Sequence, residues 1–454
     1  MGESTEKAPL RDHTGTIRHL DVVRARRLVQ FFARPAVLDD GRLTWDERDS
    51  LAAATHGWMT VDHPAAAGGS AVVGHYNTHL YLHGLVRLPL SVARELVQHR
   101  GHLYLDRLTS ITDAVAAELG RHHAGGLSLN NLRRLSPAAA RSLGGHGGEL
   151  SLGRITRLDS DVALGLAMHA NELFLDGLQR LSPPAAAALA QHRGDLFLGK
   201  LERLPGRMAM HLARHRGKLH LHGLKRLSDA AAEAFGTRSG YLCLKSLERL
   251  SPRQAGSLAG HTGPLHLYAV DVSDAVAESL GRHAGSLMIR VADDLPLHRL
   301  HALVQHQGPL ALTGLRSLDE RRAGVLAAQP GLRGRRGDRD IMGLSGLFLD
   351  SVTDLSPASA AILATHRAGG LSLNGLTELA EDVARQLVKH PLISLDGLTR
   401  VSDRVAAILA THSGATLSLR SLRDVSGGAL AKLQANPGIE LPRRLQDRAC
   451  QPRG

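Results

Sequence analysis

A pair of leucines separated by one residue recurs along this chain at an almost constant interval. Most steps between successive pairs are 23 residues, a few are 22 or 24, and one is 37. Self-similarity at a period of this length predicts a solenoid, in which each unit contacts only its neighbours. The pairs, or their isoleucine variants, begin at Leu80, Leu103, Leu127, Leu150, Leu173, Leu196, Leu219, Leu242, Leu265, Leu287, Leu310, Leu347, Leu371, Ile393, Leu417 and Ile439.

Each unit opens with a periodicity of two residues. In the unit 173–195, Leu173 and Leu175 alternate with Phe174, so the leucines point to one side and the phenylalanine to the other. This alternation predicts a short strand whose leucines enter the core. Because each strand has to hydrogen-bond to the strands of adjacent units, the stack predicts a parallel sheet.

The second half of the same unit carries the signals of a helix. Ser182 suits the N-cap and Pro183 suits the first helical position. Ala185 and Leu189 then fall on one face at helical spacing, and the small alanine lets the helix approach the sheet. Gly194 is predicted to adopt the left-handed conformation that closes the helix.

The consensus L-x-L-x-G-L-x-x-L-S…A-x-x-L-x-x-H-x-G, over residues 80–441, resembles a bacterial variety of the leucine-rich-repeat family. The resemblance implies an α/β repeat fold, a right-handed leucine-rich-repeat-like solenoid with a parallel sheet on one face and helices on the other. It also implies recognition of a protein or ligand rather than a particular reaction. The chain departs from the family pattern at Leu108, Leu132 and Leu178, which stand where the family has an asparagine after the strand. The family's asparagine ladder is therefore expected to be absent.

The repeat also predicts the domain limits. Residues 1–79 fit the repeat poorly and are interpreted as an N-terminal cap or small helical region. Repeat block 1 covers 80–332, a basic loop or insertion covers 333–346, and repeat block 2 covers 347–441. The basic tail 442–454 ends the chain.

Composition narrows the class of protein. Aromatic residues make up 3% of the chain, so leucine and alanine have to fill the core, and no apolar run is long enough for a membrane span. The two cysteines, Cys243 and Cys450, cannot build a disulfide framework, and the first residues lack the apolar stretch of a secretory signal. Both features predict a cytoplasmic protein. The protein is also expected to be a monomer. The net charge of +12 arises from arginines interspersed with acids along most of the chain, which argues against nucleic acid as the partner.

Aromatic side chains gather on the outward side of the predicted strands. They favour a binding surface for a protein or peptide, because exposed aromatics on a rigid face are typical of such surfaces. The alternative is that strands favour aromatics in general and that a neighbouring element covers these. The same outward register holds Cys243, Phe348 and several serines. The predicted partner-binding residues are Tyr81, Tyr104, Phe174, Phe197, His220 and His266 in this register, with Tyr241 and Tyr268 beside it.

An acidic row and a histidine row also follow the repeat. Glu149, Glu172 and Asp195 occupy one position on consecutive units and predict a solvated acidic rim, with a bound cation or basic peptide as the alternative. The chain has 27 histidines, most of them at the ends of the predicted helices. A single-file row does not converge on a metal ion, so we interpret it as structural, with imidazoles bonding to helix-end carbonyls. Its predicted members are His99, His123, His146, His169, His192, His215, His261, His283, His306, His366, His390 and His412.

The chain lacks the common catalytic motifs. It has no P-loop, no H-E-x-x-H, no C-x-x-C and no G-x-S-x-G, so it is predicted to be non-enzymatic, with no catalytic residue, resident metal or cofactor. One rival hypothesis is a metal-dependent or thiol hydrolase built on His220, Cys243 and His266, which share a register at 23-residue spacing. Another is a purely structural spacer.

Overall fold

The computed structural model describes residues 20–23, 25–26, 79–82, 84–268, 271–330 and 346–446. The chain divides into two compact units, Met1–Gly223 (unit 1) and Leu224–Gly454 (unit 2). Most of the predicted N-terminal region 1–79, the insertion 333–346 and the tail 442–454 lies outside the described residues. The limits of those three segments therefore stay predictions.

In unit 1 a two-residue strand alternates with a helix of two turns, as the change of periodicity predicts. The strands are β1 (Leu80–Tyr81), β2 (Leu103–Tyr104), β3 (Leu127–Ser128), β4 (Leu150–Ser151), β5 (Leu173–Phe174), β6 (Leu196–Phe197), β7 (Arg203–Leu204) and β8 (Leu219–His220). The helices are α4 (Leu90–Leu96), α5 (Asp113–Leu119), α6 (Pro137–Leu143), α7 (Ser160–Ala167), α8 (Pro183–Leu189) and α9 (Gly206–Leu212).

Unit 2 repeats this alternation with slightly longer strands. Its strands are β9 (Arg226–Leu227), β10 (Leu242–Leu244), β11 (Leu265–Leu267), β12 (Leu287–Arg290), β13 (Leu310–Thr313), β14 (Ser317–Leu318), β15 (Gly346–Phe348), β16 (Asp354–Leu355), β17 (Gly370–Ser372), β18 (Leu392–Ser394), β19 (Thr416–Ser418) and β20 (Ile439–Glu440). Its helices are α10 (Asp229–Gly236), α11 (Pro252–Ala259), α12 (Asp274–Gly281), α13 (Leu297–Val304), α14 (Glu320–Ala327), α15 (Pro357–Leu363), α16 (Glu381–Leu387), α17 (Asp403–Leu409), α18 (Gly427–Gln434) and α19 (Arg443–Gln446).

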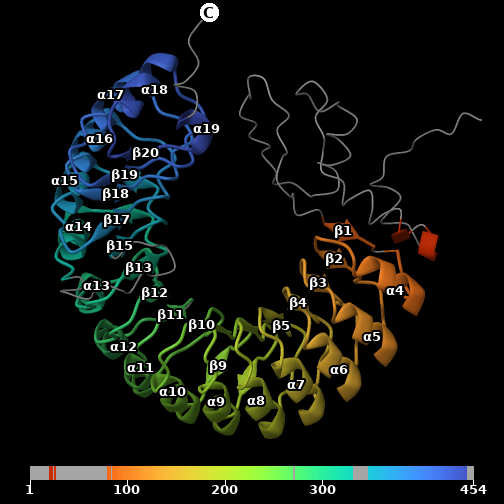
Figure 1. The fold of residues 1–454 in the computed structure, drawn as a ribbon. Helices are drawn as coiled ribbons and strands as arrows, with labels where there is room; N and C mark the ends of the chain where they lie inside the picture. The colour runs from red at the N-terminus through yellow and green to blue at the C-terminus, as the bar shows by residue number, and fades with distance from the viewer. Residues whose placement is uncertain are drawn as a thin grey trace, which may run out of the picture. The chain divides into compact units, whose positions relative to one another are not determined.

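Within each unit the strands form a parallel sheet in which every coil of the repeat stacks in register on the one before. Leu173 pairs with Leu196 and Phe174 with Phe197, one period apart. The strands line the inner side of each unit's curved stack and the helices line the outer side (Figure 1). A helix is wider than the 4.8 Å spacing of strands, which bends such a stack toward its strands. The predicted α/β solenoid is confirmed.

The sheet of unit 2 continues without interruption across the longest step in the repeat. β13 pairs directly with β15, with Leu310 opposite Leu347, although these two residues are 37 positions apart. The additional residues of this coil therefore leave the register of the sheet unchanged.

Leucine and alanine fill the core, as the low aromatic content requires. In the coil that contains β5 and α8, Leu173, Leu175, Leu178, Ala185 and Leu189 are all fully buried. The leucine at 178, which replaces the family's asparagine, is thus a core residue. The apolar side chains that two adjacent coils bury between them supply the stabilisation that a single coil lacks.

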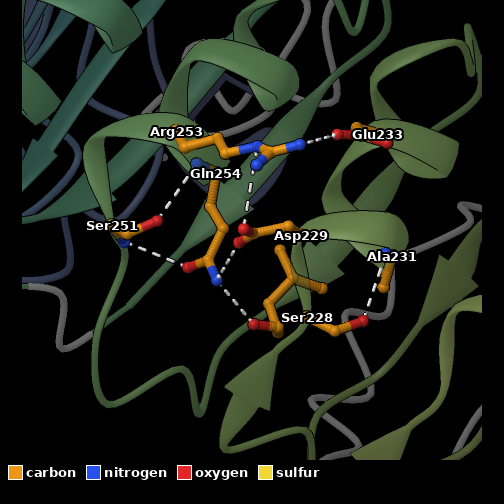
Figure 2. A network of polar contacts seen from close by, with 8 residues as sticks. Ser228, Asp229, Ala231, Glu233, Ser251, Arg253 and Gln254 are labelled. Atoms are coloured by element: carbon orange, nitrogen blue, oxygen red, sulfur yellow. Dashed lines mark hydrogen bonds and ion pairs between the residues drawn. The ribbon is translucent and has the colours of Figure 1, made fainter.

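The helix starts follow the predicted capping chemistry. The Ser182 hydroxyl accepts a hydrogen bond from the Ala185 amide at 3.3 Å, and Pro183 occupies the first turn of α8. At the start of α11, Ser251 and Gln254 form a reciprocal capping box (Figure 2).

The same Gln254 side chain also connects α11 to the preceding coil. Its amide nitrogen donates to the Leu227 carbonyl oxygen at 2.8 Å and to the Asp229 carboxylate at 2.9 Å. Arg253 beside it donates to Glu233 at 3.0 Å, also on the preceding coil (Figure 2). Helix capping and coil stacking therefore share one polar network in unit 2.

The helix ends differ from the prediction. Gly194 does not have a left-handed φ; the positive-φ glycines among the described residues are Gly314, Gly346 and Gly369. Instead α8 ends in a tightened turn, in which the His192 amide donates to the Leu189 carbonyl at 3.0 Å. Gly194 is required for another reason, because a Cβ there would collide with the carbonyl oxygen of Asn171 on the preceding coil.

This role of Gly194 predicts a specific stability change. Replacing Gly194 by Ala should lower the free energy of unfolding by about 1–3 kcal/mol, because the backbone of one coil would be pushed off the next. Gly256 is the matched control, since it lies within α11 and a Cβ there meets no atom within 4 Å. Gly256→Ala should be neutral or stabilising by up to about 1 kcal/mol. Urea denaturation measures both, and a Gly194→Ala variant as stable as the wild type would contradict the close-approach explanation.

Candidate functional site

The first aromatic cluster lies on β1 and β2. Tyr81 and Tyr104 are opposite each other in register, and their rings stack with centroids 4.4 Å apart. Beside this pair, the ring centroids of His79 and His102 are 4.7 Å apart. Both tyrosines are half-buried, and burial, reinforced by the neighbouring Tyr81, raises the pKa of Tyr104 to about 12. The Tyr104 ring therefore stays neutral at ordinary pH.

The second aromatic cluster lies on β5, β6 and β8. The rings of Phe174 and Phe197 stack at 4.2 Å, and Phe197 stacks on His220 at 4.0 Å. His222 meets His220 edge-on, with Nδ1 of His220 3.3 Å from Nε2 of His222. Phe174, Phe197 and His220 are each half-buried. The register of the sheet thus converts one aromatic per coil into a continuous stack.

The third aromatic cluster lies in unit 2. The Tyr241 hydroxyl is 3.0 Å from Nδ1 of His266, and their rings meet edge-on. The Tyr268 hydroxyl donates to the sulfur of Met288 at 3.5 Å, and the Lys245 ammonium lies 5.5 Å from the centre of the Tyr268 ring. Each predicted partner-binding residue therefore belongs to one of three local clusters.

The outward register is less exposed than the alternation of the strand suggests. Phe348 is 6% exposed, His266 is 8% exposed and Cys243 is fully buried. Cys243 lies between the strands of the larger His220 and His266, which shield it from solvent, whereas Phe348 lies between the smaller Ala311 and Ser372, so the size of its neighbours does not explain its burial. The expectation that all of these side chains face solvent is corrected for these three.

The burial of Cys243 bears on the rival thiol hydrolase. Desolvation raises the pKa of the Cys243 thiol, which keeps it protonated at neutral pH. Thiolates rather than thiols are nucleophiles, and reactive cysteines have lowered rather than raised pKa values. This side chain is therefore poorly suited to nucleophilic catalysis.

The serines of the same register form a polar ladder that the sequence analysis missed. The Ser128 hydroxyl donates to the Asp106 carboxylate at 2.5 Å, and the Ser151 hydroxyl donates to the side-chain oxygen Oδ1 of Asn130 at 2.7 Å. The backbone amide nitrogen of Asn130 also donates to the Asp106 carboxylate, at 2.9 Å. In unit 2 the same bonds join Ser372 to Asp350, Ser394 to Asn374 and Ser418 to Asp396.

A sequence signal for this ladder was present. An Asp or Asn two residues after the outward position of one coil precedes a Ser at the outward position of the next coil, as with Asp106 and Ser128. Each side-chain oxygen thus accepts from a hydroxyl and a backbone amide of the next coil, a role similar to that of the asparagines which the family carries elsewhere. The hydroxyls of these serines already donate to Asp and Asn side chains within the protein. The serines therefore have less hydrogen-bonding capacity for a partner, and the aromatic clusters are the better candidates for binding.

The acidic row has partners within unit 1. Glu149 lies 3.3 Å from Nδ1 of His102, and hydrogen bonding to His102 lowers the pKa of the Glu149 carboxyl. Asp195 is 2.9 Å from the Lys218 ammonium and accepts a hydrogen bond from the Lys218 backbone amide. These contacts compensate much of the repulsion between neighbouring carboxylates, and they make a bound cation unnecessary at both positions.

The histidine row is a buried stack of imidazoles, with one ring per coil. Successive rings lie about one strand spacing apart, for example 6.0 Å between His169 and His192. Arg238 and Gln329 occupy the row where histidine is missing, and both are buried. The buried members are His99, His122, His146, His169, His192 and His215 in unit 1, and His261, His283, His306, His366, His390 and His412 in unit 2.

One predicted member of this row was wrong. His122 is fully buried, whereas its neighbour His123 is exposed. The row position is three residues after the last leucine of the helix, because the His122 amide donates to the Leu119 carbonyl oxygen. Counting from Leu119 instead of from the helix end would have selected the correct histidine of the pair.

Some imidazoles of the row contact backbone carbonyls of the preceding coil, whereas both ring nitrogens of His169, His192 and His306 are buried without a hydrogen-bond partner among the described residues. Nε2 of His122 lies 3.0 Å from the His99 carbonyl oxygen, and Nδ1 of His412 lies 3.0 Å from the Val388 carbonyl oxygen. The structural interpretation of the row, that its imidazoles bond to helix-end carbonyls, is confirmed for these histidines. Burial lowers the pKa to about 4 for His122, about 3 for His146 and about 4 for His169.

No protein-family model matches the chain, and no curated protein matches it. Its in-register strands, capped helices and leucine core form a repeat stack. The chain is an α/β repeat solenoid. Among solved structures, a leucine-rich-repeat protein of Leptospira interrogans has 17% identity and a TM-score of 0.35, over 79% of this chain and 93% of that one. A chain of the Toll–Spatzle complex of Drosophila has 15% identity and a TM-score of 0.29, over 80% of this chain and 43% of that one.

The helices were also compared with the requirements of a membrane span. Among the described residues, every helix is too short or too polar to cross a bilayer.

The buried histidines predict a loss of stability in acid. An unfolded histidine has a pKa near 6.5, whereas the folded value in the row is lowered, so the unfolded chain binds more protons between these two pH values. Stability should therefore be fully present above about pH 6.5 and fall toward pH 4, by about 1.4 kcal/mol per pH unit for each row histidine whose pKa is lowered. Chemical denaturation at a series of pH values measures this slope.

A matched pair of variants isolates the row. His146→Gln should reduce the slope by about one histidine's share, because the neutral Gln329 already occupies the same position in another coil. The exposed His123→Gln should leave the slope unchanged. Equal slopes in the wild type and the His146→Gln variant would show that buried imidazoles do not control the acid sensitivity.

Proposed function

We propose that this protein is a non-enzymatic scaffold that binds a protein or peptide through the three aromatic clusters of its strand side. The single observation that carries the proposal is the half-exposed ring stack of Phe174, Phe197 and His220. The Tyr81–Tyr104 stack supports it in the same unit, and the half-buried Tyr241 and Tyr268 support it in unit 2, where His266 is buried beside Tyr241.

The energetics of recognition favour such clusters. Tyrosine and phenylalanine offer large contact areas with few rotatable bonds, so little entropy is lost when a partner immobilises them. Here the register of the sheet already holds the rings in stacks, which lowers that cost further. The serine rows, whose hydroxyls are bonded to Asp and Asn, lack this combination of apolar area and exposure.

The alternative hypothesis, that neighbouring elements cover the aromatic side chains, agrees with the burial of Phe348 but not with the exposure of Phe174 and Phe197. Phe348 shares their register but is buried, whereas Phe174 and Phe197 remain half-exposed. A purely structural spacer would also have no need for solvent-facing rings of this kind. We further propose that the protein is a cytoplasmic monomer, in accordance with its cysteine content.

The rival metal-dependent hydrolase is tested by elemental analysis. Full-length protein purified without a His-tag is expected to contain far less than one zinc ion per chain. One equivalent of zinc that is lost in both His220→Ala and Cys243→Ala variants would instead favour the rival. This measurement requires no knowledge of a substrate.

The binding proposal predicts a loss of partner capture without loss of the fold. A Phe174→Ser/Phe197→Ser variant of the full chain should capture its specific partner from native cell extract at least about ten-fold less well than the wild type. Its free energy of unfolding should fall by no more than about 2 kcal/mol, because the two rings are only half-buried. Quantitative mass spectrometry of the captured proteins and urea denaturation measure the two effects.

The control is a variant that removes exposed apolar side chains from the helix side of the same unit. Leu164 on α7 is 48% exposed and Met210 on α9 is 57% exposed. Leu164→Ser/Met210→Ser should capture the partner as the wild type does. Equal capture by all three proteins, or a strong loss of stability in the phenylalanine variant, would contradict the proposal.

A further inference from the structure

A groove lined by positive charge lies on the loops that follow β3, β4 and β6 in unit 1. It encloses about 400 Å³ and is lined by Arg133, Arg134, Arg154 and Lys200, here called the basic groove. The other lining residues are Gly153, Thr156, Gly177 and Gln179, so no carboxylate contributes to its wall. All four cationic side chains belong to exposed residues.

Glycines form the floor of the basic groove. A Cβ on Gly177 would collide with the carbonyl oxygen of Gly153, so two coils approach each other here through bare backbone. The four cationic side chains line the same groove. The result is a depression with charged walls rather than a flat charged surface.

The positive charges of the basic groove have no internal counter-charge. Among the residues that the structure describes, none of its four cations takes part in an ion pair. Arg154 donates to the side-chain oxygen of Asn131 at 2.8 Å, which is an uncharged amide. Like charges gathered around one groove repel one another, which is unfavourable in the free protein and favours the binding of an anion.

The corresponding loops of unit 2 show that this fold does not require an uncompensated groove. There a groove of about 350 Å³ is lined by Glu378, Arg400 and Asp424 together with serines and valines. Arg400 pairs with Glu378 at 2.6 Å. Glu378, Arg400 and Asp424 stand seven residues after the first leucine or isoleucine of the repeated pair in their coils, which is the position of Arg134. At this position unit 2 therefore balances its charges, whereas unit 1 has an arginine that is unpaired among the described residues.

We propose that the basic groove binds an acidic segment of the protein partner. This inference rests on the proposed function in taking the partner to be a protein, and it adds the chemistry of a second contact. Guanidinium groups donate paired hydrogen bonds to carboxylates, so each of the three arginines can bind one Asp or Glu side chain of the segment.

Two observations favour an acidic protein segment over a nucleic acid. No aromatic side chain lines the basic groove, so it offers no platform for stacking bases. Glu149, Glu172 and Asp195 lie at the other edge of the same strand side, where the phosphates of a nucleic acid that crossed the strands would be repelled. A protein segment can place its carboxylates at the groove alone.

The test uses the full chain and fluorescein-labelled poly-L-glutamate as the acidic probe, with binding followed by fluorescence anisotropy. An Arg134→Glu/Arg154→Glu variant should bind the probe at least about ten-fold more weakly, equivalent to about 1.4 kcal/mol. Its affinity should also depend less steeply on salt than that of the wild type, because fewer charge pairs are screened.

The matched control changes the net charge by the same amount elsewhere in unit 1. Arg141 and Arg193 are exposed and lie outside the basic groove, so Arg141→Glu/Arg193→Glu should retain most of the affinity. Equal melting temperatures of the two double variants confirm that both are folded. If poly-L-glutamate does not bind the wild type, or if both double variants lose affinity equally, the basic groove is not a specific acidic-segment site.

Two further measurements separate this inference from its alternatives. The Phe174→Ser/Phe197→Ser variant should bind poly-L-glutamate like the wild type, so failure of the aromatic proposal and failure of the groove proposal give different results. A labelled single-stranded oligonucleotide should bind more weakly than poly-L-glutamate. Tighter oligonucleotide binding with the same dependence on Arg134 and Arg154 would overturn the assignment to an acidic protein segment.

Discussion

The in-register hydrogen bonding of parallel strands is the constraint on which the other features of this protein depend. It sets adjacent coils about 4.8 Å apart and places each position of the repeat over the same position of the preceding coil. Where adjacent coils have the same residue type at one position of the repeat, these identical side chains have to pack directly against one another. Leucine meets this requirement easily, which explains why it dominates the core.

Other residue types meet the same requirement in different ways. Rings such as Phe174 and Phe197 stack face to face, and serines bond to an interposed Asp or Asn. Row histidines such as His146 stay neutral, because burial disfavours the charged imidazole and a charged neighbour at this distance would add repulsion. Glycines such as Gly194 let the backbones touch. The arginines of the basic groove differ, because none of them takes part in an ion pair among the described residues.

Sequence periodicity was sufficient to predict the strands, the helix caps and the core, because these depend on residues within one coil. It was not sufficient where an outcome depends on the neighbouring coil. Phe348 and Phe174 occupy the same position of the repeat, yet one is buried and the other half-exposed. The role of Gly194 depends on a carbonyl oxygen of the preceding coil, and the cationic character of the groove depends on which charges lack a partner. The assignment of the aromatic clusters to binding stays a proposal.

The direct pairing of β13 with β15 separates the length of a coil from its place in the stack. Leu310 and Leu347 are opposite each other although this coil contains 37 residues where most contain 23. The solenoid is thus organised by its strands and not by the number of residues between them. For protein engineering, this coil is the preferred acceptor for an inserted reporter domain, because added length there has already been accommodated without a shift of register.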